Sequence, residues 1–383
     1  MKKSKLIFAA LFSYLASCHA FAATYVYVSN KEDGTISSFE LNQKTGKLLP
    51  TPKASTPIGL NIGPTVISPD HQYLYAITRD KPYFAQSFKI NAKTGDLTAF
   101  AKTMIPSSYA YSTLDKTGQY LLSASYDDDL VSIHKVEDGK VLDQPIQTIR
   151  TQPNTHAVIT DQSNQNVYVT SLSGQVIHQY RFDPSNGHAY ILKPATVSLD
   201  EQMTPRHLII SQSNEYVYVL DEVAAKVITY KRDAKDGHLT QIAVTASMAP
   251  DSTLNIGAPR GEWRSANPAL KANQDTTKDI WAADIHITPN GKFLYSSERT
   301  TSTLTLFHID IETGIPTRVK SFATEKQPRG FNISPNGRFL ISAGEKTGKV
   351  SVFKIDQKTG ELSLKQRYPV GLNPLWISIT DID

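Results

Sequence analysis

The chain of 383 residues has one cysteine, Cys18, which lies near its N-terminus. The rest of the sequence therefore has no thiol for a disulfide, a thiolate nucleophile or a cysteine-ligated zinc ion. A large excess of charge of one sign is also missing, because 40 Lys and Arg residues stand against 36 Asp and Glu residues. This near balance gives no electrostatic reason to expect a nucleic-acid partner.

Long apolar runs are missing as well, so no membrane span is expected. The most apolar stretch covers residues 6–16 and is far shorter than the roughly 20 residues that a membrane-spanning helix needs. It follows Lys2, Lys3 and Lys5, which is the arrangement of a signal peptide. This segment accounts for most of the net charge, since removing its lysines lowers the formal value from +4 to +1.

The predicted leader ends at an Ala-x-Ala cleavage site over residues 20–22. We therefore expect a signal peptide at 1–22, a mature chain at 23–383 and a periplasmic location. A second interpretation remains open, because residues 15–18 resemble a lipobox, in which Cys18 would be lipidated and would anchor the protein. We favour the first, since the Ala-x-Ala site directly precedes the first predicted strand.

Helical periodicity is absent, and two short signatures recur instead. The first is a tight turn with Gly where a hairpin needs positive φ. It occurs seven times, at Gly46, Gly95, Gly139, Gly187, Gly237, Gly314 and Gly360. The second is a strand-like run rich in Tyr, Val and Leu. It also occurs seven times, around Val26, Leu74, Leu121, Tyr168, Tyr218, Leu294 and Leu340.

Both signatures repeat every 44 to 50 residues, with one period of 77. Four short strands per period are typical of a propeller blade, so the sequence predicts an all-β, seven-bladed β-propeller. The chain begins with the second strand of a blade, and residues 373–379 match a first strand, so pairing of the two ends is expected to close the ring. The long period contains residues 250–279, which we interpret as an inserted loop. It would be a solvated insertion or, through Arg260, Trp263 and Arg264, a lid.

The repeat also predicts where a site lies. The start of each first strand and the end of each second strand share one face and form a ring around the mouth of the central channel. Charge is concentrated on this ring in four consecutive blades. The charged positions are His156, Arg206, Glu222, Arg299, Arg329 and Glu345. Such a cluster suits an anionic or carbonyl-rich ligand. The alternative is that these side chains pair with one another as salt bridges between blades.

Three further polar residues lie on predicted first strands. His207 follows Arg206, and His286 follows Asp284 by two positions. Asp284 and His286 therefore face the same way, as two metal ligands would, but no third ligand is evident and no metal or other cofactor is expected. For the two histidines, hydrogen-bonded packing is the simpler interpretation.

Three segments and one carboxylate resemble motifs of the propeller-type 6-phosphogluconolactonases. They are residues 281–289, 327–332 and 205–207, together with Glu222. The similarity extends over nearly the whole mature chain, and it implies a metal-independent site. The catalytic residues that it implies are His156, Arg206, Glu222 and Arg299, and those expected to contact substrate are Arg329, His207, Asp284 and His286.

The chain departs from the family pattern at two places. It has His156-Ala157 where the family usually has His-Ser, after a turn that is about one residue longer. The loop over 250–279 is also longer than usual. An exported member would moreover meet plain glucono-1,5-lactone more naturally than the 6-phosphorylated lactone of the family name.

We therefore expect a sugar-lactone hydrolase that opens glucono-1,5-lactone or 6-phosphoglucono-1,5-lactone, with this small molecule as its partner. Arg206 and Arg299 would polarise the carbonyl, while His156 or Glu222 activates water. Two alternatives remain. The related fungal carboxymuconate lactonising enzymes suggest a cycloisomerase that acts on a muconate-type acid, and propellers also serve as non-catalytic binding modules. The oligomeric state is left open.

Overall fold

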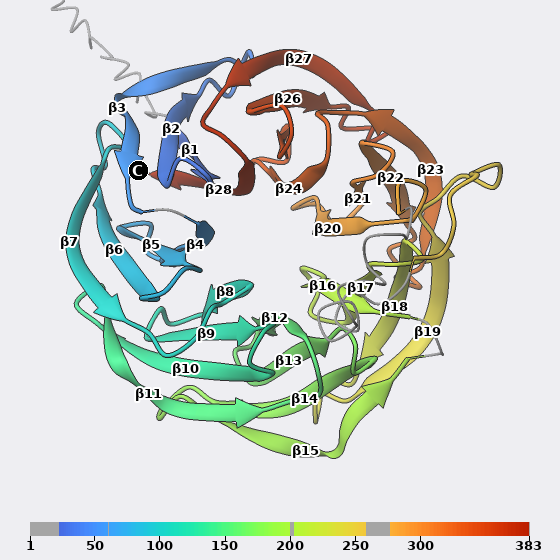
Figure 1. Cartoon of the computed structure of the whole chain (residues 1–383). Helices are drawn as coiled ribbons and strands as arrows, with labels where there is room; N and C mark the ends of the chain where they lie inside the picture. Colours follow the sequence, from blue (N-terminus) through green and yellow to red (C-terminus); the bar gives the residue numbers. More distant parts are fainter. Residues whose placement is uncertain (1–22, 60, 200–202, 258–275, 383) are drawn as a thin grey trace, which may run out of the picture.

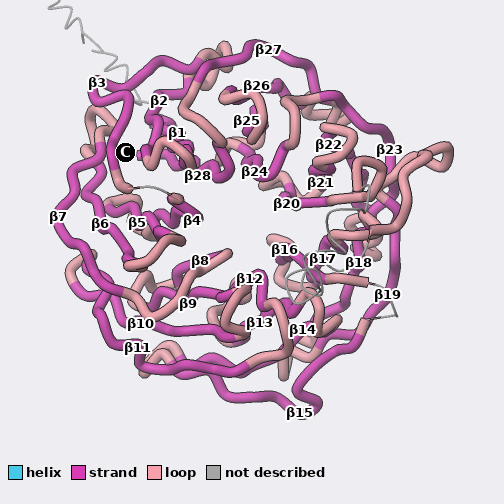
Figure 2. Tube along the Cα trace, viewed as in Figure 1, coloured by secondary structure: helices cyan, strands magenta, loops and turns pink. Residues whose placement is uncertain are grey.

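The computed structural model describes residues 23–59, 61–199, 203–257 and 276–382. The predicted leader with Cys18, and Arg260, Trp263 and Arg264 of the inserted loop, lie outside the described residues. Within the described ranges the secondary structure consists of strands and the turns between them, and none of it is a helix that could cross a membrane (Figure 2).

The strands form seven four-stranded antiparallel sheets arranged around a central channel, as the sequence predicted (Figure 1). Each sheet is one blade, and its strands follow one another from the channel outward. The innermost strands, for blades 1 to 7 in turn, are β28 (Pro374–Ile382), β4 (Ile62–Ile67), β8 (Tyr111–Leu114), β12 (Thr155–Thr160), β16 (Pro205–Ile210), β20 (Ala282–Ile287) and β24 (Pro328–Ile333).

The second strands lie between the innermost strands and the outer half of each blade. They are β1 (Ala23–Asn30), β5 (Tyr73–Thr78), β9 (Tyr120–Ser125), β13 (Asn166–Ser171), β17 (Tyr216–Asp221), β21 (Phe293–Glu298) and β25 (Phe339–Gly344). Five of the seven are buried at every residue, because neighbouring blades pack against both of their faces. This burial explains why they are continuous apolar runs rather than alternating ones.

The outer half of each blade is built from the third and fourth strands. The third strands are β2 (Thr35–Leu41), β6 (Phe84–Ile90), β10 (Leu130–Glu137), β14 (Val176–Asp183), β18 (Lys226–Arg232), β22 (Thr303–Ile309) and β26 (Lys349–Ile355). The fourth strands are β3 (Leu48–Pro57), β7 (Leu97–Met104), β11 (Lys140–Arg150), β15 (His188–Ser198), β19 (Leu239–Ala246), β23 (Pro316–Ala323) and β27 (Leu362–Pro369). The fourth strands form the exposed rim of the propeller (Figure 1).

The two ends of the chain close the ring within blade 1. β28 pairs antiparallel with β1, so that Val26 lies opposite Ile379. The predicted closure is therefore confirmed. It covers the inner edge of β1, which would otherwise be open to unwanted strand pairing.

The hairpin glycines are required for two reasons, their positive φ and the close packing of the neighbouring blade against them. In blade 2, Gly95 has a φ of 69°, and a Cβ atom at this position would overlap the ring of Tyr25 from blade 1. The hydroxyl of Tyr27 donates a hydrogen bond to the Gly95 carbonyl at 2.8 Å. At all seven hairpin glycines an added Cβ atom would likewise overlap a side chain near the start of the preceding blade's second strand. Adjacent blades are thus fastened to each other all around the ring.

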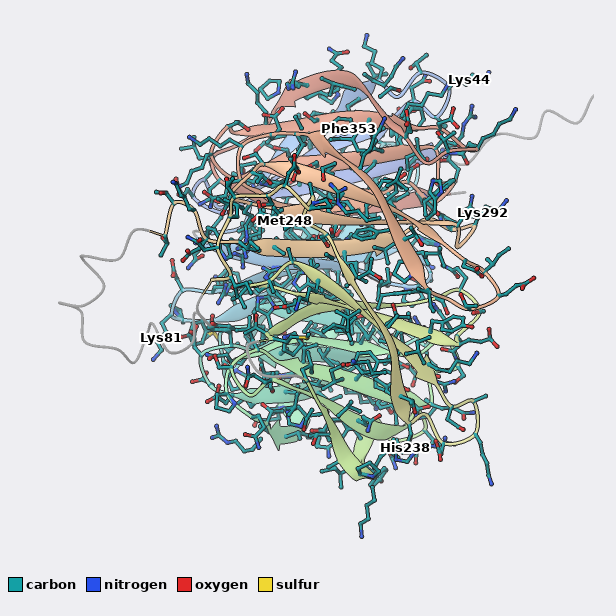
Figure 3. The ribbon with its side chains drawn as sticks, turned by 90° about the vertical axis from the view of Figure 1, so that its right-hand side faces the viewer. Lys44, Lys81, His238, Met248, Lys292 and Phe353 are labelled. Atoms are coloured by element: carbon teal, nitrogen blue, oxygen red, sulfur yellow. The ribbon has the colours of Figure 1, made fainter. Side chains whose placement is uncertain are left out.

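The two faces of the propeller carry different connections. In the side view, Lys44 and Lys292 lie on one face, and Lys81 lies on the other (Figure 3). Lys44 belongs to a hairpin between third and fourth strands and Lys292 to a turn between first and second strands, whereas Lys81 follows the end of a second strand. The starts of the first strands and the ends of the second strands therefore share the Lys81 face, as the repeat predicted.

Candidate functional site

Two cavities lie along the central channel in the part of the chain that the structure describes. The one that we call the mouth cavity has a volume of about 170 Å³ and lies at the ring of first-strand starts and second-strand ends. Its charged lining residues are Lys31, Arg79, Arg206, Arg329 and Glu345. The one that we call the inner cavity is larger, about 450 Å³, and is lined mainly by the later halves of the innermost strands.

His207 and Trp376 line both cavities and separate them. The rings of His207, Trp376 and Tyr111 contact one another edge to face, with centroids 5.2 to 6.0 Å apart. We call these three residues the plug. Trp376 and Tyr111 were not singled out from the sequence, because an aromatic residue on a strand is far more often part of a core than of a site.

Arg206, Glu222 and Arg299 form a buried ionic triad across blades 5 and 6. Glu222 Oε2 lies 2.8 Å from Arg206 Nε and 3.1 Å from Arg299 Nη2. The side chains of the two arginines are each only 1% exposed. The sequence placed all three on one rim, and the structure brings them into direct contact, which is also what the salt-bridge alternative expected.

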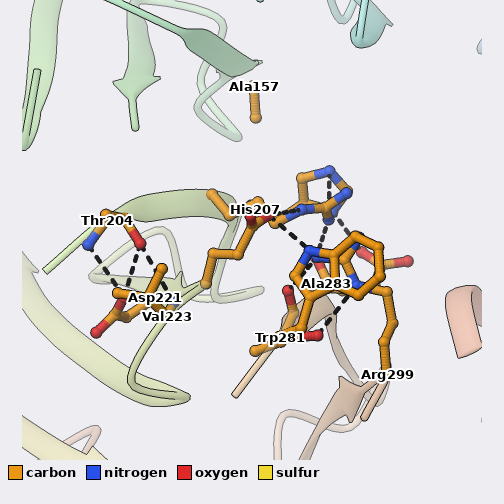
Figure 4. Close-up of polar contacts among 12 residues, drawn as sticks. Ala157, Thr204, His207, Asp221, Val223, Trp281, Ala283 and Arg299 are labelled. Atoms are coloured by element: carbon orange, nitrogen blue, oxygen red, sulfur yellow. Dashed lines mark hydrogen bonds and ion pairs between the residues drawn. The ribbon is translucent and has the colours of Figure 1, made fainter. Parts of the chain in front are cut away.

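Two turns hold this triad in place. Asp221 Oδ1 accepts hydrogen bonds from the backbone N–H groups of Thr204 and Val223, which fixes the chain on both sides of Glu222 (Figure 4). In the next blade, Glu298 accepts from the backbone N–H groups of Trp281 and Thr301. Each turn thus has a buried carboxylate whose role is to fix the backbone beside a charged site residue.

Arg299 is held behind the mouth cavity. Its Nε donates to the Trp281 carbonyl at 3.0 Å, its Nη2 donates to the Ala282 carbonyl at 2.9 Å, and its guanidinium lies 3.7 Å from the centre of the Trp281 ring (Figure 4). Burial lowers the pKa of Arg299, although Glu222 opposes that shift. Neither Arg299 nor Glu222 belongs to the lining of the mouth cavity, so Arg206 is the member of the triad that faces it.

Arg206 forms an ion pair and hydrogen bonds with three described residues, and one of its terminal nitrogens has no described acceptor. Besides Glu222, its Nη1 donates to the Ala283 carbonyl and to His207 Nε2, the latter at 3.1 Å. No described residue accepts a hydrogen bond from Nη2. Burial lowers the pKa of Arg206 to about 10, so the guanidinium stays charged at neutral pH. It can therefore present N–H donors to a ligand in the mouth cavity.

His207, Asp284 and His286 form a hydrogen-bonded chain below Arg206. His207 Nδ1 lies 2.8 Å from Asp284 Oδ1, and Asp284 Oδ2 lies 3.2 Å from His286 Nε2. Asp284 and His286 line the inner cavity, and of the three only His207 reaches the mouth cavity. The structure therefore joins these predicted residues into one network but places only His207 beside the expected ligand. Among the described residues there is no cluster of three or more metal-ligating side chains.

His156 lies beside His207, with ring centroids 5.0 Å apart. It is 5% exposed, and its Nδ1 has no hydrogen-bond partner among the described residues. Burial, followed by the positive charge of Arg206, holds the pKa of His156 well below its usual range. The imidazole is thus neutral at physiological pH and can accept a proton.

The remaining charges of the mouth cavity are mostly positive. Arg329 forms no hydrogen bond or ion pair with any described residue, and the same holds for the Lys31 ammonium. Burial and the neighbouring charges of Arg329 and Arg79 lower the pKa of Lys31. Lys31 and Arg79 occupy ring positions in blades 1 and 2 and were not among the predicted site residues, because most of the charged ring positions belong to blades 4 to 7. One carboxylate, Glu345, shares the lining with four cations, which favours an anion or a developing oxyanion.

Comparisons with known proteins agree with this geometry. A family model described as "Lactonase, 7-bladed beta-propeller" matches residues 61–379. The 6-phosphogluconolactonase of Pectobacterium carotovorum is 32% identical over 358 residues, which cover 94% of this chain and 99% of that protein. The 6-phosphogluconolactonase of Yersinia pestis is also 32% identical, over 92% of this chain and 97% of that protein.

A solved structure supports the fold. The periplasmic gluconolactonase of Pseudomonas aeruginosa superimposes with a TM-score of 0.81 at 20% identity, covering 94% of this chain and 100% of that protein. At 20% identity this comparison shows a shared propeller fold and no more. The chain is thus similar in sequence to lactonases and similar in fold to a further one.

Proposed function

The chain belongs to the family of seven-bladed β-propeller lactonases, and we propose that it hydrolyses a sugar 1,5-lactone to the corresponding acid. The observation that carries this proposal is the mouth cavity. Its wall includes a buried arginine with unused N–H donors, Arg206, and His207; the neutral buried imidazole of His156 is not part of this lining but packs directly against His207. Arg206 and His156 are the two elements that ester hydrolysis needs, a site for the oxyanion and a base for water.

Arg206 and Arg329 bind the lactone carbonyl oxygen in this proposal. As water adds to the carbonyl carbon, negative charge grows on that oxygen and strengthens its hydrogen bonds with the guanidinium groups. Because Arg206 is already fixed by Glu222 and Ala283, little reorganisation is needed when the charge develops. Arg299 contributes to the same positive potential from behind, since Glu222 links it to Arg206.

His156 is the proposed general base. It accepts a proton from the attacking water, and it returns that proton to the ring oxygen when the bond between this oxygen and the carbonyl carbon breaks. The product acid then releases a proton to solvent. Glu222 was the other candidate, but its carboxylate oxygen is engaged by two arginines, whereas Nδ1 of His156 has no hydrogen-bond partner among the described residues.

The substrate that we propose is glucono-1,5-lactone, in the plain or the 6-phosphorylated form. The relatives with 32% identity carry the name of the phosphorylated substrate. The cations Lys31, Arg79 and Arg329 can accommodate a phosphate. The predicted leader, in contrast, favours the plain lactone, because it would export the enzyme to the periplasm, where sugar phosphates are not the expected substrates.

Periplasmic location is part of the proposal and rests on the leader at 1–22. Cell fractionation followed by N-terminal sequencing tests it, with a mature chain that starts at Ala23 as the expected result. A protein that stays with the membrane and is released by the change Cys18→Ser would establish the lipoprotein alternative instead.

The proposed activity is tested by measuring proton release from both lactones with the purified protein. A rate well above spontaneous hydrolysis for at least one of them is the expected result. Hydrolysis no faster than without enzyme, together with tight binding of a muconate-type dicarboxylate, would instead support the cycloisomerase alternative.

A further inference from the structure

Four residues of adjacent innermost strands form an unbroken chain of hydrogen bonds across the plug. Arg206 Nη1 contacts His207 Nε2 at 3.1 Å, His207 Nδ1 contacts Asp284 Oδ1 at 2.8 Å, and Asp284 Oδ2 contacts His286 Nε2 at 3.2 Å. Arg206 lines the mouth cavity, whereas His286 lines the inner cavity. The chain of bonds therefore connects the two cavities.

The direction of each bond follows from the chemistry of its partners. A guanidinium can only donate, so His207 Nε2 must be the unprotonated nitrogen of the ring. The proton of the neutral imidazole is then on Nδ1, which donates to Asp284. His286 in turn donates from Nε2 to the other oxygen of the same carboxylate. One tautomer of His207 satisfies all of these bonds at once.

Asp284 is firmly held as an ionised acceptor. Burial alone would raise its pKa, but His286 and His207 outweigh that effect and the pKa lies well below its usual range. The backbone N–H groups of Ile285 and Phe331 donate to its two oxygens as well. The carboxylate thus fixes both the tautomer and the orientation of His207.

We propose that Asp284 and His286 are positioning residues: through His207 they fix the direction of the Arg206 guanidinium, so that a side chain of the inner cavity influences catalysis in the mouth cavity. This inference rests on the proposed lactone hydrolysis. It gives His207 the role of an acceptor that restrains Arg206 Nη1, while Nη2, which has no acceptor among the described residues, stays available for a ligand. His286 contacts neither the mouth cavity nor Arg206, and it acts through two other side chains.

The decisive comparison uses two variants of His286 and one control. The change His286→Leu removes the donor to Asp284, whereas His286→Gln keeps an N–H donor at a similar distance along the side chain. Gln212 also lines the inner cavity but takes no part in the network, so Gln212→Ala serves as the control. We expect His286→Leu to lower kcat roughly 10-fold with little change in KM, and we expect the Gln variant to recover most of this loss.

A purely structural role for His286 predicts a different pattern. His286→Leu would then lower the melting temperature while kcat stayed within twofold of the unchanged protein, and that result would overturn the inference. Equal loss of kcat in the Leu and Gln variants would also contradict it, since the donor would then not matter. The matched control should leave both kcat and KM unchanged.

A second measurement is independent of turnover. Nuclear magnetic resonance of ring-labelled histidine distinguishes the two neutral tautomers, and His207 should be the Nδ1–H form in the unchanged protein. In the Asp284→Asn and His286→Leu variants we expect a mixture of both forms. If no lactone is hydrolysed at all, the proposed function fails, yet this readout still decides whether the network fixes His207. A Nε2–H form in the unchanged protein would refute the network directly.

Discussion

Arg206 Nε lies 2.8 Å from Glu222 Oε2, and both side chains are almost completely buried. This pair does more than link two strands of blade 5, because the same oxygen also receives Arg299 from blade 6. The carboxylate lowers the cost of holding two guanidinium groups side by side away from water. The mouth cavity can therefore have a fixed positive charge at its wall.

Removing this carboxylate charge should destabilise the protein strongly. In Glu222→Gln the two arginines would lose their shared counter-ion while remaining buried, so we expect the free energy of unfolding to fall by about 3 kcal/mol. Glu361 forms an exposed pair with Lys320 and serves as the control. The change Glu361→Gln should cost less than about 1 kcal/mol, as is usual for surface pairs. Urea denaturation measures both, and equal losses would contradict the account.

His156 should be essential for turnover but not for binding. We expect His156→Gln to reduce kcat roughly 100-fold with little change in KM, because the water would lose its base. Since the pKa of His156 is held well below its usual range, the base is protonated only in more acidic solution. The rate should therefore be flat from pH 6 to 8 and should fall only at lower pH. A rate that halves near pH 6.5 would argue against this histidine.

Lys31 should discriminate between the two candidate substrates. Its ammonium shares the mouth cavity with Arg79 and Arg329, so a phosphate would relieve the repulsion among the three cations. In Lys31→Met we expect KM for 6-phosphoglucono-1,5-lactone to rise about 10-fold and KM for the plain lactone to stay nearly constant. Steady-state kinetics with both lactones provides the test. Equal changes for the two would show that no charged group of the substrate lies near Lys31.

The hairpin glycines allow a test of how the blades are fastened together. In Gly95→Ala the new methyl group would meet the Tyr25 ring in addition to adopting a positive φ, and we expect a loss of about 3 kcal/mol or more. Gly291 also has a positive φ, but the space beside it is open. Gly291→Ala should therefore cost only about 1 kcal/mol. Similar losses in thermal or urea unfolding would mean that the contact between blades is unimportant.

Two buried histidines should make the protein less stable in acid. Burial lowers the pKa of His178 and of His207 to about 4, below the roughly 6.5 of an unfolded chain. Below pH 6.5 these histidines bind protons in the unfolded state but stay neutral in the folded state. The free energy of unfolding should therefore fall as the pH drops from 6.5 to 4. The slope of the free energy of unfolding against pH is set by the difference in bound protons between the two states, and His178→Gln should lower that difference by up to one proton. An unchanged slope would show that His178 does not titrate as we infer.

The fold followed from the sequence because the repeat is strict. Each period has one positive-φ glycine and one buried run, and together they assign every strand its place and every charged residue its face. The repeat predicted that Arg206, Glu222, Arg299 and Arg329 lie around one channel mouth. In the structure Arg206 and Arg329 line the mouth cavity, and Glu222 and Arg299 join Arg206 in the ionic triad.

The repeat could not predict which of these residues line the mouth cavity, which lie behind it and which line the inner cavity. Periodicity gives the face on which a residue starts but not how deep its side chain reaches, so it did not show that Glu222 and Arg299 lie behind Arg206. The spacing of Asp284 and His286 predicted a common direction, and the structure confirms that both side chains line the same cavity. That the two cavities are separate depends on Trp376 and Tyr111, whose positions in three dimensions no local pattern reveals.

Arg206 is the group that receives the developing oxyanion in the proposed reaction. The direct measurement compares proton release from glucono-1,5-lactone and its 6-phosphate for the unchanged protein, for Arg206→Ala and for Arg338→Ala, an exposed arginine in a turn of blade 7. We predict that Arg206→Ala lowers kcat roughly 100-fold or more on the better substrate, while Arg338→Ala changes nothing. A folded Arg206→Ala variant that hydrolyses both lactones at the original rate would contradict the proposed site.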